Sequence, residues 1–133
     1  MPCVLVVDDD PMICMAVESC LHRPGFDIIL AAQAEAAVQA LEAGHFDLML
    51  LNVFIPRIDG FETIRFRRHI GSMAIIAMFG RLSAQPQTAS EFLRMTLELG
   101  ATLCLRRPFT PAALLSAVNT SLSVRATPAG VSN

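Results

Sequence analysis

The sequence predicts an α/β fold in which a doubly wound, five-stranded parallel sheet carries helices on both faces. Short apolar runs alternate with longer amphipathic segments, and this strand–helix pattern repeats five times along the chain. The short runs are apolar at nearly every position rather than at every second one, which is typical of strands buried on both faces. Repeated strand–helix units favour parallel strands joined by helical crossovers.

Local signals mark the ends of these elements. Asp10 is an N-cap candidate and Pro11 suits the first turn of a helix, while Thr110 precedes the last helix in the same way. Gly44 and Gly100 follow two helical segments, as glycine commonly does. The expected strands are residues 3–7, 26–31, 46–51, 74–78 and 101–105. The expected helices are residues 12–22, 33–43, 61–68, 88–99 and 111 to about 122.

The 133 residues are predicted to form one domain over residues 1–123, followed by a flexible tail over residues 124–133 that has no periodicity. Hydrophobic residues make up 53% of the chain and charged residues 17%, so a sizeable core is expected. The net charge of −2 does not indicate the excess of basic residues that is typical of nucleic-acid-binding proteins. All ten basic residues are arginines, which excludes any mechanism that needs a lysine of this chain.

Neither membrane insertion nor secretion is expected. No apolar run approaches the length that spans a bilayer, and no basic flank precedes an apolar stretch at the N-terminus. The four cysteines show no CxxC spacing, which favours free thiols in a reducing compartment over disulfides or a metal site. We therefore expect a cytoplasmic location.

Polar residues gather at the carboxyl ends of the expected strands. Open parallel sheets carry their working sites at this edge. The residues at these ends are Asp8, Asp9, Asp10, Asn52, Phe79, Arg106 and Arg107. These residues therefore predict an acidic pocket at the carboxyl edge of the sheet, with at least one arginine in it.

From Cys3 to about Leu122, the chain resembles the receiver domains of response regulators, the CheY-like, flavodoxin-like switch modules of two-component phosphorelay signalling. The resemblance rests on the acidic cluster after the first strand, on the segment 46–60, and on the run 107–110. Counting back from Pro56 and Gly60, the family's phosphoacceptor aspartate falls at position 52, where this chain has asparagine. A neutral amide oxygen is a far poorer nucleophile than a carboxylate.

Three further positions depart from the family pattern. By the resemblance, Arg107 takes the place of the lysine that contacts the phosphoryl group, and Arg107-Pro108 matches a Lys-Pro pair that often has a cis peptide bond. Phe79 takes the place of the Thr or Ser switch residue, although phenylalanine cannot donate a hydrogen bond. Cys104 takes the place of the aromatic switch residue. The resemblance thus implies a receiver without the usual switch.

Receivers hold Mg²⁺ in the acidic pocket. The resemblance implies Asp9 as a direct ligand, Asp8 acting through water, Asn52 as the second ligand and the backbone carbonyl of Phe54 as the third. With two acids and one arginine, this pocket is less negative than that of a working receiver. Arg107 could pair with Asp8 or Asp9 as an internal counterion. We therefore expect weak Mg²⁺ binding.

The resemblance implies an atypical single-domain response regulator, a pseudo-receiver that is not an enzyme and acts by protein–protein interaction. Its expected partner is a histidine kinase, a phosphotransfer protein, another signalling protein, or a second copy bound through the last two helices and the fifth strand. In that region, Leu103 and Leu105 are better interpreted as core. Neither nucleic acid nor a membrane is an expected partner.

Two alternatives remain. Asp8 or Asp9 could be a relocated phosphoacceptor. The run of aspartates also resembles the DxD motif of haloacid-dehalogenase-type phosphatases. Those enzymes normally need further acids after a later strand, and neither the third nor the fourth expected strand supplies them.

Overall fold

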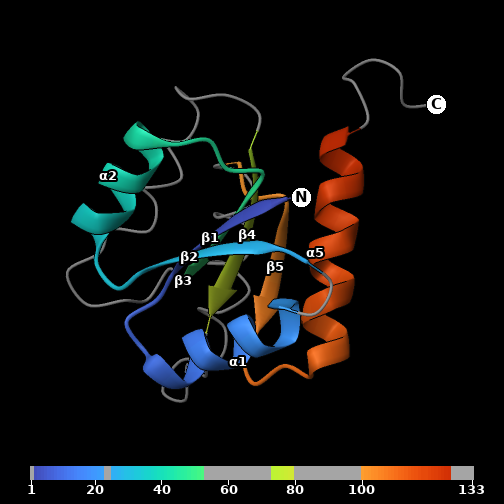
Figure 1. Ribbon diagram of the computed structural model, residues 1–133. Helices are drawn as coiled ribbons and strands as arrows, with labels where there is room; N and C mark the ends of the chain where they lie inside the picture. Colours follow the sequence, from blue (N-terminus) through green and yellow to red (C-terminus); the bar gives the residue numbers. More distant parts are fainter. Residues whose placement is uncertain (1, 23–24, 53–72, 80–99, 127–133) are drawn as a thin grey trace.

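The computed structural model describes residues 2–22, 25–52, 73–79 and 100–126 (Figure 1). Its elements are β1 (Cys3–Val7), α1 (Pro11–His22), β2 (Asp27–Ala31), α2 (Ala34–Ala43), β3 (Leu48–Asn52), β4 (Ala74–Phe79), β5 (Leu103–Arg106) and α5 (Pro111–Ala126). The helices expected at residues 61–68 and 88–99 lie outside the described residues. Within the described residues no helix is long and apolar enough to cross a membrane.

All five strands run parallel in one sheet, in the order β2-β1-β3-β4-β5. This order confirms the predicted doubly wound sheet. The chain turns from one half of the sheet to the other between β1 and β3, and ligands of open α/β sheets bind beside such a switch point. Val7 of β1 pairs with Leu51 of β3, so the residues that follow them emerge side by side.

Two apolar layers hold the sheet between its helices. One layer joins Leu5 and Met49 of the sheet to Ala37 and Leu41 of α2. The other joins the opposite face of the sheet to α1 and α5, which lie on the same side. Figure 1 shows α2 on one side of the sheet and α5 on the other. Residues Val4 to Val7 and Leu48 to Leu51 have no exposed surface, as expected for strands covered on both faces.

The predicted helix starts are confirmed. Oδ1 of Asp10 accepts a hydrogen bond from the backbone N–H of Met12 at 2.9 Å, and Oγ1 of Thr110 accepts one from Ala113 at 3.0 Å. Each side chain satisfies a donor that the first turn leaves without an intrahelical acceptor.

The predicted end of the last helix was wrong. Helix α5 continues to Ala126, so residues 124–126 are helical where a flexible tail was expected. Neither glycine nor proline occurs between Leu122 and Ala126, and Pro128 is the first helix breaker in that part of the sequence. The strands also shift slightly, and β3 extends to include Asn52 itself.

Candidate functional site

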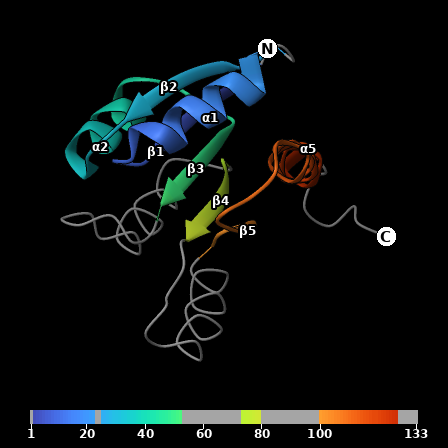
Figure 2. The ribbon, with the colours of Figure 1, turned by 90° about the horizontal axis from the view of Figure 1, so that it is seen from below.

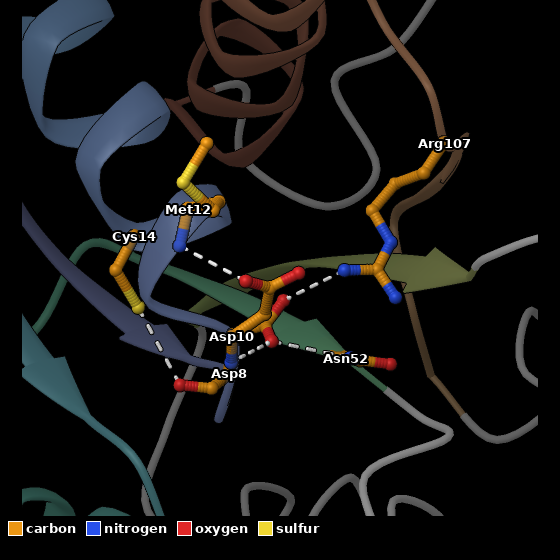
Figure 3. A network of polar contacts seen from close by, with 6 residues as sticks. All are labelled: Asp8, Asp10, Met12, Cys14, Asn52 and Arg107. Atoms are coloured by element: carbon orange, nitrogen blue, oxygen red, sulfur yellow. Dashed lines mark hydrogen bonds and ion pairs between the residues drawn. The ribbon is translucent and has the colours of Figure 1, made fainter.

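Asp8 lies at the centre of a polar network at the carboxyl end of the sheet (Figure 3). It directly follows β1, and its backbone N–H donates to the carbonyl oxygen of Ala31 at the end of β2 at 3.1 Å. The residue has no exposed surface. A buried carboxylate must find hydrogen-bond donors or a positive charge, because an isolated ion in this environment is costly.

Three groups from separate parts of the chain supply those donors. The backbone N–H of Asp10 donates to Oδ1 of Asp8 at 2.9 Å. Nδ2 of Asn52 donates to the same oxygen at 3.3 Å. Nη1 of Arg107 donates to Oδ2 at 3.2 Å and forms an ion pair (Figure 3). The end of β3 and the segment after β5 thus meet on the carboxylate that follows β1, as the sequence predicted.

Arg107 reaches Asp8 from the far half of the sheet. It directly follows β5, and its peptide bond to Pro108 is cis. Its side chain is only 17% exposed, and its Nε is buried with no hydrogen-bond partner among the described residues. The sequence left open whether Asp8 or Asp9 would pair with this arginine. The structure selects Asp8, while Asp9 is exposed.

Burial raises the pKa of Asp8 above the usual value of an aspartate, and the nearby charge of Asp9 adds to this rise. The hydrogen bonds from Asp10 and Asn52 and the charge of Arg107 lower the pKa, but they offset only part of the effect of burial. Asp8 is therefore a carboxylate whose ionised form depends on the donors around it.

The described residues offer few acidic groups to a metal ion at this site. They contain no group of three or more His, Cys, Asp or Glu side chains placed to hold a metal ion. Both oxygens of Asp8 already accept hydrogen bonds, and one of the donors is a cation. Mg²⁺ prefers oxygen ligands of hard, negatively charged groups. Phe54, whose carbonyl was the expected third ligand, lies outside the described residues.

The two predicted switch positions lie on neighbouring strands. Phe79 is the last residue of β4 and pairs in register with Arg106 of β5. Cys104 pairs with Ala77 and packs, half-buried, against the core on the α2 side of the sheet. Leu103 and Leu105 pack against the core on the opposite side, which confirms their interpretation as core residues.

One neighbour of the site was not predicted from the sequence. The thiol of Cys14, on α1, donates to the backbone carbonyl oxygen of Asp8 at 3.4 Å (Figure 3). Burial and the charges of Asp8 and Asp10 raise the pKa of this thiol. The signal in the sequence was its spacing, since Cys14 lies four residues after the cap residue Asp10 and therefore above it on the first turn.

The fold and the position of the site are those of a response regulator receiver domain. The family model of the response regulator receiver domain matches residues 4–119, and the chain belongs to this family.

Among relatives, the chain is 35% identical over 108 residues to the alkaline phosphatase synthesis transcriptional regulatory protein PhoP of Bacillus subtilis, covering 81% of this chain and 43% of that protein. It is 31% identical over 120 residues to the transcriptional regulatory protein CpxR of Escherichia coli, covering 90% of this chain and 48% of that protein. The chain thus spans less than half the length of these two relatives.

Solved structures agree on the fold. A CheY-like receiver domain protein from Methanospirillum hungatei superposes with a TM-score of 0.81 at 25% identity, covering 94% of this chain and 96% of that one. A two-component response regulator from Clostridium difficile superposes with a TM-score of 0.82 at 21% identity, covering 96% of this chain and all of that one, and shows the fold alone. The predicted CheY-like fold is confirmed.

Proposed function

We propose that this chain is an atypical receiver that is not phosphorylated at the usual position and acts in two-component signalling through protein–protein contacts. The observation that carries the proposal is the hydrogen bond from Nδ2 of Asn52 to Oδ1 of Asp8, at 3.3 Å. In a working receiver this position holds a carboxylate that attacks phosphorus. Here the side chain is a neutral amide that donates a hydrogen bond into the acidic pocket.

The pairing of Arg107 with Asp8 supports the same function. A working receiver gathers negative charge to bind Mg²⁺, and the metal then assists phosphoryl transfer. In this chain an internal cation lies 3.2 Å from the buried carboxylate. A divalent cation would have to compete with the guanidinium, so we expect weak Mg²⁺ binding and a single conformation of the pocket.

Signalling without this reaction requires a partner that recognises the folded surface. The candidates are a histidine kinase, a phosphotransfer protein or another signalling protein. The relatives PhoP and CpxR are transcriptional regulators by name, and the chain matches less than half of each. We propose no enzymatic activity for this chain.

A relocated acceptor is the second candidate function. Asp9 is exposed and adjoins the pocket, whereas both oxygens of Asp8 are engaged in hydrogen bonds. Between the two, Asp9 is the more accessible nucleophile.

Labelling with acetyl phosphate and Mg²⁺, followed by intact mass measurement, tests both candidates. We expect no phosphoryl adduct on this chain while a typical receiver is labelled in parallel. A stable adduct would contradict the proposal. If Asp9→Ala then abolished the adduct and Asp10→Ala did not, the relocated acceptor would replace it.

A further inference from the structure

Strand β2 forms an open edge of the sheet. It pairs with β1 on one side, and the strand order places it at the end of the sheet. In Figure 2, β2 lies at one end of the row of strands and β5 lies at the other. Edge strands present unpaired backbone groups to other chains, and natural proteins usually protect them with charges, proline or bulges. The five residues of β2, DIILA, contain a single charge, at Asp27.

The backbone of β2 has a definite pattern of free groups. The N–H of Asp27 donates to Pro2, and the carbonyl of Ala31 accepts from Asp8, so these residues face β1. Backbone groups alternate along a strand, and Ile29 therefore also faces β1. Ile28 and Leu30 direct their N–H and C=O groups outward, away from the sheet.

Two apolar side chains of β2 are exposed, one on each face of the sheet. Ile29 is 47% exposed and Leu30 is 45% exposed, although both lie within a strand. Ile29 shares its face with Ala31, which packs on the α2 side, and Leu30 shares its face with Ile28, which packs on the α1 side. A strand placed alongside β2 would cover both residues.

We propose that β2 pairs with the β2 strand of a second copy of this chain, antiparallel and with the two-fold axis at Ile29. This register places Ile28 of one copy opposite Leu30 of the other. The outward backbone groups of these residues then exchange hydrogen bonds, as an antiparallel pair requires. The two copies of Ile29 face each other across the axis.

The sequence of β2 is self-complementary in this register. Asp27 lies opposite Ala31, so the two carboxylates sit at opposite ends of the joined strands rather than against each other. Like charges directly opposite would destabilise the pair. Each copy has one β2 edge, and the two-fold contact uses the β2 edge of both copies. This contact therefore closes as a dimer.

This surface differs from the last two helices and fifth strand, which the resemblance suggested for self-association. It also involves neither Asn52 nor Arg107. An experiment can therefore contradict the proposed dimer without contradicting the proposed absence of phosphorylation, and the reverse.

Sedimentation equilibrium over a range of concentrations tests the association. The contact is short, so we expect a weak dimer in exchange with monomer. Ile29→Lys places two lysines opposite each other and should weaken the dimer by about tenfold or more. Val124→Lys, at a 56% exposed position on α5, is the matched control and should leave it unchanged. Circular dichroism checks that both variants are folded.

Cysteine cross-linking tests the register without disrupting the surface. Directly opposite residues at a non-hydrogen-bonded position lie about 4.5 Å apart at Cα, within reach of a disulfide. Ile29→Cys should give an intermolecular 29–29 disulfide, identified by peptide mass spectrometry against the unmodified chain. Ile28→Cys and Leu30→Cys should cross-link with each other when mixed and far less with themselves.

The proposal is overturned by any of three results. The first is a chain that stays monomeric at all concentrations. The second is a dimer that Val124→Lys weakens and Ile29→Lys does not. The third is open-ended aggregation in place of a dimer.

Discussion

Nη1 of Arg107 lies 3.2 Å from Oδ2 of Asp8, so a cation of the chain itself contacts a carboxylate that has no exposed surface. The two residues follow β5 and β1, which are separated by β3 and β4 in the sheet. The ion pair therefore spans the carboxyl edge of the sheet beside Asn52. It supplies an internal positive charge to the buried carboxylate.

Removing the guanidinium should destabilise the fold. Arg107→Ala leaves Asp8 buried with two neutral donors, and we expect the free energy of unfolding at neutral pH to fall by about 1–3 kcal/mol. Arg107→Lys keeps the charge and should cost less. Urea unfolding gives both values. The exposed neighbour Arg106 provides the control, and an equal loss in Arg106→Ala would show that the ion pair contributes nothing.

The stability should depend on pH through Asp8. Burial raises the pKa of this carboxyl in the folded state above 3.8. The folded protein therefore holds this proton more strongly than the unfolded chain. The resulting stabilisation is complete below the pKa of the unfolded group and is lost as the pH rises through the higher pKa of the folded one.

Urea unfolding of the wild type and of Asp8→Asn from pH 3 to pH 7 isolates this contribution, because the other groups titrate in both proteins. We expect the wild type to lose stability relative to Asp8→Asn as the pH rises over this window. Arg107→Ala should shift the loss to higher pH, since the guanidinium lowers the pKa of Asp8. Parallel profiles for wild type and Asp8→Asn would contradict the assignment.

The sheet and the meeting of three site residues could be predicted from the sequence. Runs that are apolar at nearly every position indicate strands covered on both faces, and parallel strands bring their carboxyl ends to one edge. Asp8, Asn52 and Arg107 each stand at or just after such an end. Their convergence follows from the topology and needs no knowledge of side-chain conformation.

Other features depend on relationships that the sequence does not contain. Asp8 and Asp9 are adjacent and chemically identical, and the tertiary structure distinguishes them. Asp8 is buried and accepts hydrogen bonds from distant residues, among them Arg107, whereas Asp9 is exposed. The exposure of Ile29 depends on the place of β2 at the end of the sheet, since the same apolar run would be buried in a central position. The thiol of Cys14 reaches Asp8 because α1 begins at Pro11.

Replacing Asn52 with aspartate should restore part of the metal site. Asn52→Asp is isosteric, but it replaces an amide donor 3.3 Å from Asp8 with a second negative charge. Without divalent cations, the variant should be less stable by about 1–2 kcal/mol, because two carboxylates then share the pocket. Mg²⁺ should offset this loss.

Calorimetry should show Mg²⁺ binding at least about tenfold tighter in Asn52→Asp than in the wild type, because the affinity of such sites rises with the number of charged ligands. The double variant Asn52→Asp/Arg107→Lys replaces the guanidinium that competes with Mg²⁺ for the pocket. We expect acetyl phosphate to label this variant. Tight, micromolar Mg²⁺ binding by the wild type, or no gain in the variant, would refute the proposed weak site.

Ser121 should be replaceable by alanine with a gain in stability. Its side chain has no exposed surface, and its hydroxyl oxygen has no hydrogen-bond partner among the described residues. Burial of an unpaired hydroxyl costs about 1–3 kcal/mol, and alanine also favours the helix more than serine does. We therefore expect Ser121→Ala to raise the free energy of urea unfolding by about 1 kcal/mol or more. Ser116→Ala, at an exposed position of α5, measures the helix preference alone. If Ser121→Ala gained no more than this control or lost stability, the hydroxyl would have to make a hydrogen bond in solution.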